Sequence, residues 1–237
     1  MTGRVPGRPA GSRTALLVLT SNGVLGDTGR STGAYASEVA ESWRTFASAG
    51  YRVEVASIQG GRPPLEAVDT GDPAQQALFA DEAMTAALAS TLPVREVDPT
   101  AYQIVFTAGG HGAIWDLPYD EALAALLRDA YENDAVIAAV CHGPAAFLGT
   151  RLSNGEYLVA GRNVACFTND EERAVGMTSV VPFLLADELV ERGAKHDAAG
   201  PFLPHVVVDG RLVTGQNPAS TELVAEQAIA VATASPA

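Results

Sequence analysis

Residues 135–147 read AVIAAVCHGPAAF. A run of β-type apolar residues leads to Cys141, and Gly143-Pro144 then opens a helix-like stretch, because proline is favoured in the first turn of a helix. A side chain at a sharp turn from strand to helix is forced outward, as in the nucleophile elbow of hydrolases. The stretch therefore predicts a buried strand that delivers a thiol to the edge of a sheet in an α/β fold.

The rest of the chain repeats this alternation of apolar runs and helical periods. The expected strands span residues 14–20, 52–58, 103–109, 136–141 and a hairpin over 205–215. The first expected helix carries the apolar stripe Tyr35, Val39, Trp43 and Phe46. Further helices are expected over 74–90, 120–133, 182–193 and 220–232. Strands that are apolar on both faces predict a mostly parallel sheet with helices on both faces. Sites in such sheets form at the carboxyl ends of the strands.

Length and composition favour one domain. With 237 residues, 47% of them hydrophobic, the chain can bury one large core, so we expect a single domain over 13–237. Residues 1–12 are rich in Gly, Pro and Arg and are expected to form a disordered tail.

Charge and cysteine content exclude several classes of partner. The 15 basic and 28 acidic residues give a net charge of −13, and the chain has no basic cluster for nucleic acid or an anionic membrane. The longest apolar run near the N-terminus, 15–19, is too short to span a bilayer. Two cysteines suit a reduced, cytoplasmic protein, because a disulfide framework normally uses more.

Cys141 is the candidate nucleophile. N–H groups at the start of the following helix would favour its thiolate, and Ala139 and Gly143 supply the small residues that an elbow needs. The alternative is a buried structural cysteine, which is the interpretation we favour for Cys166.

A histidine and three acidic residues are candidate partners for this thiol. His142 is adjacent to it, and either Glu171 or Glu172 of FTNDEE could orient the imidazole, unless these acids are only the solvated start of a helix. Glu38 borders the apolar stripe of the first helix, where a partly desolvated carboxyl would have a raised pKa and could hold a proton beside the thiol. The alternative for Glu38 is a side chain that reaches solvent.

The segment TAGGHGAIWDLP, 107–118, completes the candidate site. Paired glycines let a backbone approach a ligand closely, and the Gly110 N–H could join the His142 N–H in an oxyanion hole. No phosphate-binding loop motif is present. His111 could line the pocket or bind metal, but His111, His196 and His205 show no ligand spacing, so no metal site is expected.

Together, five segments resemble the DJ-1/PfpI superfamily, also called type 1 glutamine amidotransferase-like, and within it the Hsp31-type branch of glutathione-independent glyoxalases. They are residues 32–64, GGHGAIWDLP, AVCHGPAAF, residues 167–194 and HVVVDGRLVTGQNPAST. The resemblance implies a flavodoxin-like three-layer sandwich and usually a homodimer. It also implies Cys141 as nucleophile beside His142, Glu38 against the sulfur, and Glu172 as the support of His142, with Glu171 as the fallback.

The chemistry that the resemblance implies is the conversion of methylglyoxal, a small 2-oxoaldehyde, to lactate through a cysteine hemithioacetal, without any cofactor. Two features depart from the family pattern: ESWRTF lacks a frequent proline, and the extra metal ligands of some relatives are missing. Three alternatives remain. The first is another cysteine-dependent enzyme, an amidase, a peptidase or a deglycase. The others are a holdase chaperone with an exposed apolar patch and a redox sensor.

Overall fold

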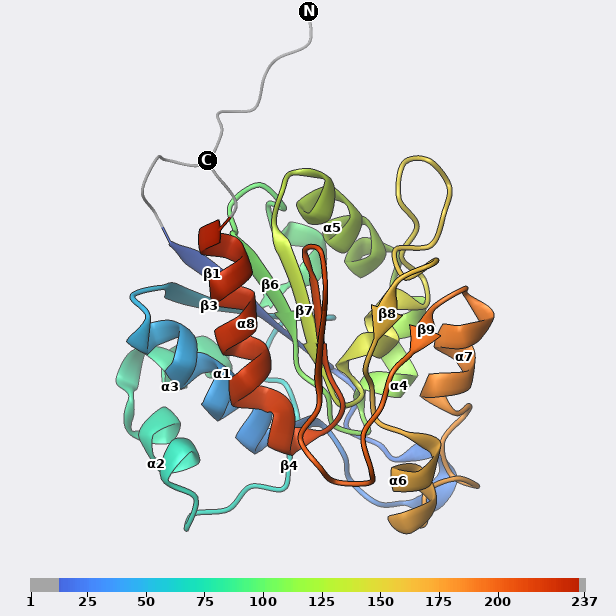
Figure 1. Ribbon diagram of the computed structural model, residues 1–237. Coiled ribbons are helices and arrows are strands. Elements are labelled where there is room, and N and C mark those ends of the chain that lie inside the picture. The colour runs from blue at the N-terminus through green and yellow to red at the C-terminus, as the bar shows by residue number, and fades with distance from the viewer. Residues whose placement is uncertain (1–12, 235–237) are drawn as a thin grey trace, which may run out of the picture.

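A seven-stranded sheet forms the centre of the molecule (Figure 1). The computed structural model describes residues 13–234, so the tail expected for 1–12 lies outside the described residues. The strand order is β10-β11-β7-β6-β1-β3-β5, and all neighbours are parallel except the β10–β11 hairpin. The strands are β1 (Thr14–Leu19), β3 (Arg52–Ser57), β5 (Leu92–Pro93), β6 (Ile104–Thr107), β7 (Val136–Val140), β10 (Val206–Asp209) and β11 (Leu212–Gly215).

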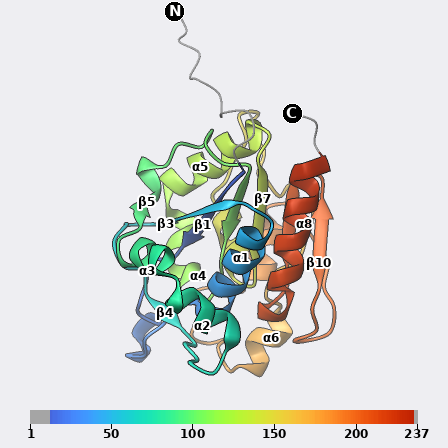
Figure 2. The same cartoon turned by 90° about the vertical axis from the view of Figure 1, so that its left-hand side faces the viewer.

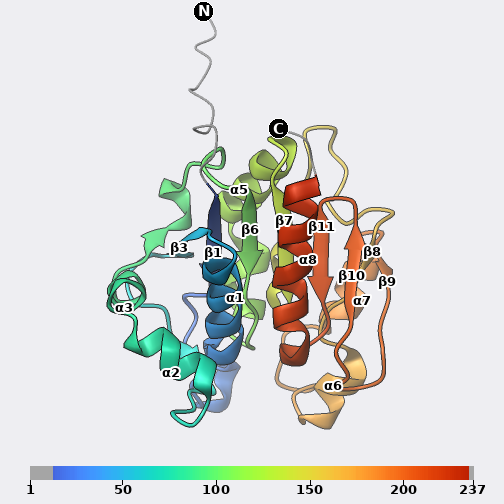
Figure 3. The ribbon, with the colours of Figure 1, turned by 60° about the vertical axis from the view of Figure 1, so that its left-hand side comes forward.

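Helices cover both faces of the sheet, and Figures 2 and 3 show α1 and α8 side by side on one face. That face carries α1 (Ala36–Ser48), α2 (Pro73–Ala80), α3 (Glu82–Ala89) and α8 (Thr221–Ala234), and the opposite face carries α4 (Ala113–Asp116), α5 (Glu121–Glu132) and α7 (Leu185–Glu191). Within β1, Leu17 packs toward the first group and Leu16 toward the second, so the strand is buried on both faces. Of the helices in residues 13–234, none has the length and apolar character needed to cross a membrane.

Short elements connect these layers. Two small sheets pair β2 (Ala34–Tyr35) with β4 (Leu65–Glu66) and β8 (Asn163–Val164) with β9 (Lys195–His196). The helix α6 spans Asn169–Ala174. Within the described residues there are also five 3₁₀ segments: η1 (Gly26–Thr28), η2 (Val94–Glu96), η3 (Leu117–Tyr119), η4 (Gly143–Phe147) and η5 (Pro218–Ser220).

The predicted sheet with helices on both faces is confirmed, with local corrections. The helix expected over 74–90 is two helices, because Asp81 adopts an extended backbone and its side chain accepts a hydrogen bond from Met84 N at 2.9 Å, which starts α3. The segment expected as a helix over 182–193 is helical only in α7.

Candidate active site

Cys141 lies on the turn that follows β7 and has a positive φ of 60°, which is unusual for a side chain other than glycine. Its N–H donates to Gly215 O at 3.0 Å, and its carbonyl accepts from Phe167 N at 2.9 Å. Gly143 allows the chain to turn into η4, since a Cβ there would lie 2.2 Å from Thr107 O. The strained conformation is therefore fixed by neighbours on both sides, as expected of a functional turn.

The GGHG loop follows β6, the neighbour of β7 in the sheet, and brings its backbone against Cys141. Gly110 has a φ of 96°, and a Cβ there would lie 2.3 Å from Gly33 O. A Cβ at Gly109 would lie 2.6 Å from His142 N, so this close approach requires glycine. The N–H groups of Gly110 and His142 both hydrogen-bond the thiol and favour its ionised form.

Burial keeps the thiol protonated at rest, although the N–H groups that were expected to favour its thiolate are in place. Cys141 is only 4% exposed, and burial, followed by the charge of Glu38, raises its pKa well above the ordinary value. The two N–H groups act in the opposite direction but do not outweigh burial. The sulfur must therefore lose its proton to a nearby base when it reacts.

Glu38 is completely buried at the start of α1 and faces the thiol. Its Oε2 accepts from Gly109 N at 2.6 Å, whereas Oε1 hydrogen-bonds to no group within residues 13–234. Burial raises the pKa of Glu38 to about 8, against the hydrogen bond from Gly109 and the contact with Cys141. This carboxyl therefore keeps its proton at neutral pH, with one oxygen left for another partner.

His142 and Glu172 complete the group around the sulfur. His142 Nδ1 is 3.4 Å from Cys141 Sγ, and His142 Nε2 is 2.9 Å from Glu172 Oε2. Burial lowers the pKa of His142, so the imidazole is neutral, and its Nε2–H donates to the carboxylate while Nδ1 presents a lone pair to the thiol. Burial opposes ionisation of Glu172, but hydrogen bonds from His111 and His142 outweigh it and lower its pKa to about 2.

Glu171, the fallback for this role, points away from His142. Its Oε2 accepts from Thr168 N and Oγ1, both at 2.9 Å. Its Oε1 accepts from Phe202 N at 2.8 Å, Asn217 Nδ2 at 2.8 Å and Gln216 Nε2 at 3.1 Å. Glu171 therefore ties α6 to two other segments and is a structural carboxylate.

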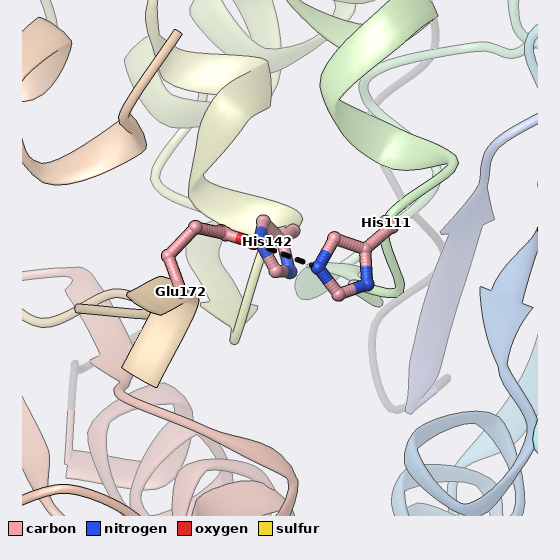
Figure 4. A group of neighbouring side chains, drawn as sticks. All are labelled: His111, His142 and Glu172. Carbon is pink, nitrogen blue, oxygen red and sulfur yellow. Dashed lines mark hydrogen bonds and ion pairs between the residues drawn. The ribbon is translucent and has the colours of Figure 1, made fainter. Parts of the chain in front are cut away.

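A second imidazole shares Glu172, which the sequence argument did not anticipate (Figure 4). His111 Nε2 is 2.9 Å from Glu172 Oε1, and the rings of His111 and His142 lie 4.4 Å apart. On the other side, His111 N donates to Glu66 Oε1 at 2.8 Å, and Thr32 Oγ1 donates to Glu66 Oε2 at 2.6 Å. Glu66 lies in the two-residue strand β4, in a stretch without any motif, so no local signal could have found it.

Phe167 also contacts the site and was not predicted. Its ring lies 4.6 Å from that of His142 and 6.4 Å from that of Phe202, which is 49% exposed. The aromatic pair forms an apolar wall from the buried imidazole to the surface. Cys166, next in sequence, is fully buried, as expected of a structural cysteine.

Known proteins share this architecture and much of this sequence. The model of the DJ-1/PfpI family matches residues 31–230. The glutathione-independent glyoxalase HSP31 of Saccharomyces cerevisiae is 33% identical over 92% of this chain and 97% of its own. The crystal structure of glyoxalase III from Candida albicans has a TM-score of 0.85 at 29% identity, covering 92% of this chain and 97% of that one.

A further solved structure is similar over nearly its whole length. The Rapid Encystment Protein of Francisella tularensis has a TM-score of 0.90 at 32% identity and covers 93% of this chain and 99% of that one. The family match spans the elbow, the GGHG loop and α6, which together hold the thiol, the two imidazoles and Glu172. The chain therefore belongs to the DJ-1/PfpI family.

Proposed function

We propose that this protein is a glutathione-independent glyoxalase that converts methylglyoxal to lactate. The observation that carries the proposal is the pair formed by the Cys141 thiol and a buried Glu38 that keeps its proton, whose Oε1 has no hydrogen-bond partner within residues 13–234. Relatives named as glutathione-independent glyoxalases, similar over most of the chain, support this proposal.

The first step is addition of the thiol to the aldehyde. The Cys141 sulfur forms a bond to the aldehyde carbon while its proton moves to His142 Nδ1, 3.4 Å away. The carbonyl electron pair moves to the aldehyde oxygen, which takes the proton of Glu38 and becomes the hydroxyl of a hemithioacetal. N–H groups of Gly110 and His142 stabilise the developing charge on this oxygen.

Isomerisation follows within the bound hemithioacetal. The Glu38 carboxylate removes the proton from the former aldehyde carbon, and His142 gives its proton to the neighbouring ketone oxygen, which yields an enediol. Glu38 then returns its proton to the second carbon, and His142 takes the proton of the first hydroxyl. The product is a lactoyl thioester on Cys141.

Hydrolysis releases lactate and restores the site. Glu38 removes a proton from water as the water attacks the thioester, and the leaving sulfur takes the proton held by His142. Oxidation of the aldehyde carbon is balanced by reduction of the ketone carbon of the same molecule. The cycle therefore consumes one water and needs no glutathione, nicotinamide, flavin or metal.

Product analysis tests this function. Purified protein is incubated with methylglyoxal, and separately with glyoxal, in the absence of glutathione, and D- and L-lactate or glycolate are measured. We expect one lactate for each methylglyoxal consumed. Hydrolysis of peptide or amide substrates without lactate formation would instead identify an amidase or peptidase that uses Cys141, His142 and Glu38.

We propose that the enzyme works in the reduced cytoplasm, since both cysteines are free in the described structure. We also propose that residues 13–237 form one domain around the single large sheet, and that the protein is a homodimer, as is usual in the family that it resembles.

A further inference from the structure

Three metal-binding side chains meet beside the thiol. One nitrogen each of His111 and His142 and an oxygen of Glu172 all lie within 4.8 Å of one another (Figure 4). Two imidazoles and a carboxylate are a ligand set that suits zinc, with a further position left for water. In the structure the three groups bind each other instead, because Glu172 accepts hydrogen bonds from both Nε2 atoms at 2.9 Å.

We propose that the His111–His142–Glu172 cluster is an inhibitory binding site for Zn²⁺ and similar divalent transition metals. The ion would replace the two protons that now lie between the imidazoles and the carboxylate. It is not a cofactor of the reaction, since it competes with the hydrogen bonds that orient His142.

The groups next to the Nδ1 atoms of the two imidazoles are compatible with the tautomers that metal binding requires. An ion on Nε2 requires each proton to sit on Nδ1, and a metal-bound histidine normally donates that proton to a carboxylate or a similar acceptor. Glu66 Oε1 lies 3.9 Å from His111 Nδ1, and Cys141 Sγ lies 3.4 Å from His142 Nδ1. His142 thus has a hydrogen-bond partner on the side away from the ion, and His111 has a carboxylate nearby on that side.

Charge and access also favour the site. The Glu172 side chain is only 3% exposed, so its carboxylate offers the ion an anionic ligand in a dry setting. The His111 side chain is 19% exposed, which gives the ion a route from solvent and lets this imidazole move to shorten the distances between ligands. His142 is held more rigidly, between Phe167 and the elbow.

Inhibition is the functional consequence, and it rests on the proposed glyoxalase activity. With the ion on Nε2, the proton of His142 is fixed on Nδ1, the atom that must accept the proton of the thiol. A metal-bound protein should therefore not convert methylglyoxal, and a chelator should restore conversion.

Cobalt titration tests binding without reference to activity. The full chain, free of any histidine tag and stripped with a chelator, is titrated with Co²⁺, and Zn²⁺ is then added. We expect one Co²⁺ per chain, with the intense visible bands of a four- or five-coordinate ion, no sulfur charge-transfer band, and displacement by Zn²⁺. A weak spectrum of a six-coordinate ion, or no saturable binding, would overturn the site.

Variants locate the ion. His111→Asn and Glu172→Gln should lose binding, whereas His205→Asn, a matched change outside the cluster, and Cys141→Ser should retain it. Glu66→Gln should weaken binding about 10-fold, as loss of an outer hydrogen-bond partner does. Unchanged binding in both His111→Asn and Glu172→Gln contradicts the assignment.

Two readouts keep this inference separate from the proposed function. If the two ligand variants fail to fold, Zn²⁺ should still raise the Tm of the wild type, because it binds only the folded state. Binding without any lactate formation would reject the glyoxalase and leave the metal site, whereas lactate formation that Zn²⁺ does not inhibit would reject the inhibitory site.

Discussion

At the scale of single residues, Glu38 shows how an unfavourable position becomes useful. A carboxyl that is fully buried on a helix is expensive unless it keeps its proton, and burial here raises its pKa to about 8. Gly109 N donates to one oxygen, and the other has no hydrogen-bond partner in the part of the chain that the structure describes. Burying an oxygen without a hydrogen-bond partner costs stability, and this oxygen, Oε1, is the one that the proposed reaction uses.

Replacement of this acid tests its role. Glu38→Gln keeps the size of the side chain and an oxygen for Gly109 N but cannot transfer a proton. We expect kcat/KM for methylglyoxal to fall by ~10²–10⁴-fold, as for loss of a general acid–base group, in a protein that is still folded. Glu41→Gln, one turn nearer the middle of α1, is the matched control and should retain activity. Equal activity of the two variants would exclude Glu38 from catalysis.

Much of the site could be inferred at this scale, and the limits have physical causes. The proximity of Cys141, His142 and Glu38 could be predicted because a strand end, an adjacent residue and a helical stripe are local patterns. The choice between Glu171 and Glu172 was left open, because adjacent residues on a helix point about 100° apart and the sequence does not fix that rotation. The position of Glu66 depends on the pairing of the two-residue strands β2 and β4, which no periodicity encodes.

At the scale of elements, the short helix α6 positions Glu172. Thr168 caps it with a capping box: its Oγ1 accepts from Glu171 N at 3.1 Å, and the Glu171 carboxylate accepts from Thr168 N. A helix of six residues has little stability of its own, so this cap and the contacts of Glu171 determine where it starts. The direction of Glu172 toward His142 depends on that start.

Removal of the cap should therefore affect both stability and catalysis. Thr168→Ala should lower the free energy of unfolding by about 1 kcal/mol and also reduce kcat. Asp81→Ala removes the cap of α3, away from the site, and should lower stability by a similar amount with kcat unchanged. Urea unfolding and initial rates measure the two quantities. If Thr168→Ala and Asp81→Ala both keep the wild-type kcat, the Thr168 cap of α6 does not position Glu172.

Long elements were predictable and short ones were not. The four expected strands, the hairpin and the helical stripe of α1 could be predicted because each contains several apolar residues, in an unbroken run or at helical spacing. The two-residue strands β2, β4, β8 and β9 contain no period that could be detected, and they pair because the larger elements bring them together. The break at Asp81 depends on a single side-chain cap within an otherwise helical sequence.

At the scale of the whole molecule, two carboxyls make stability depend on pH in opposite directions. The pKa of Glu38 is raised, so its contribution is fully present below the ordinary value of 4.5 and is lost as pH rises through about 8. The pKa of Glu172 is lowered, so its contribution is present above 4.5 and is lost as pH falls toward about 2.

Unfolding at several pH values separates the two groups. Relative to Glu38→Gln, the wild type should lose stability between about pH 5 and about pH 9, by a few kcal/mol. Relative to Glu172→Gln, it should lose stability between about pH 5 and about pH 2. Differences between each variant and the wild type that stay constant across these ranges would contradict the protonation states given above.

The covalent role of Cys141 is the central claim, and lactate formation by three folded proteins tests it most directly. Wild type, Cys141→Ala and Cys166→Ala are incubated with methylglyoxal without glutathione, after circular dichroism has shown that each is folded. The account predicts lactate from the wild type and from Cys166→Ala, and none above the uncatalysed rate from Cys141→Ala. Lactate formation by Cys141→Ala at a rate near that of the wild type would contradict it.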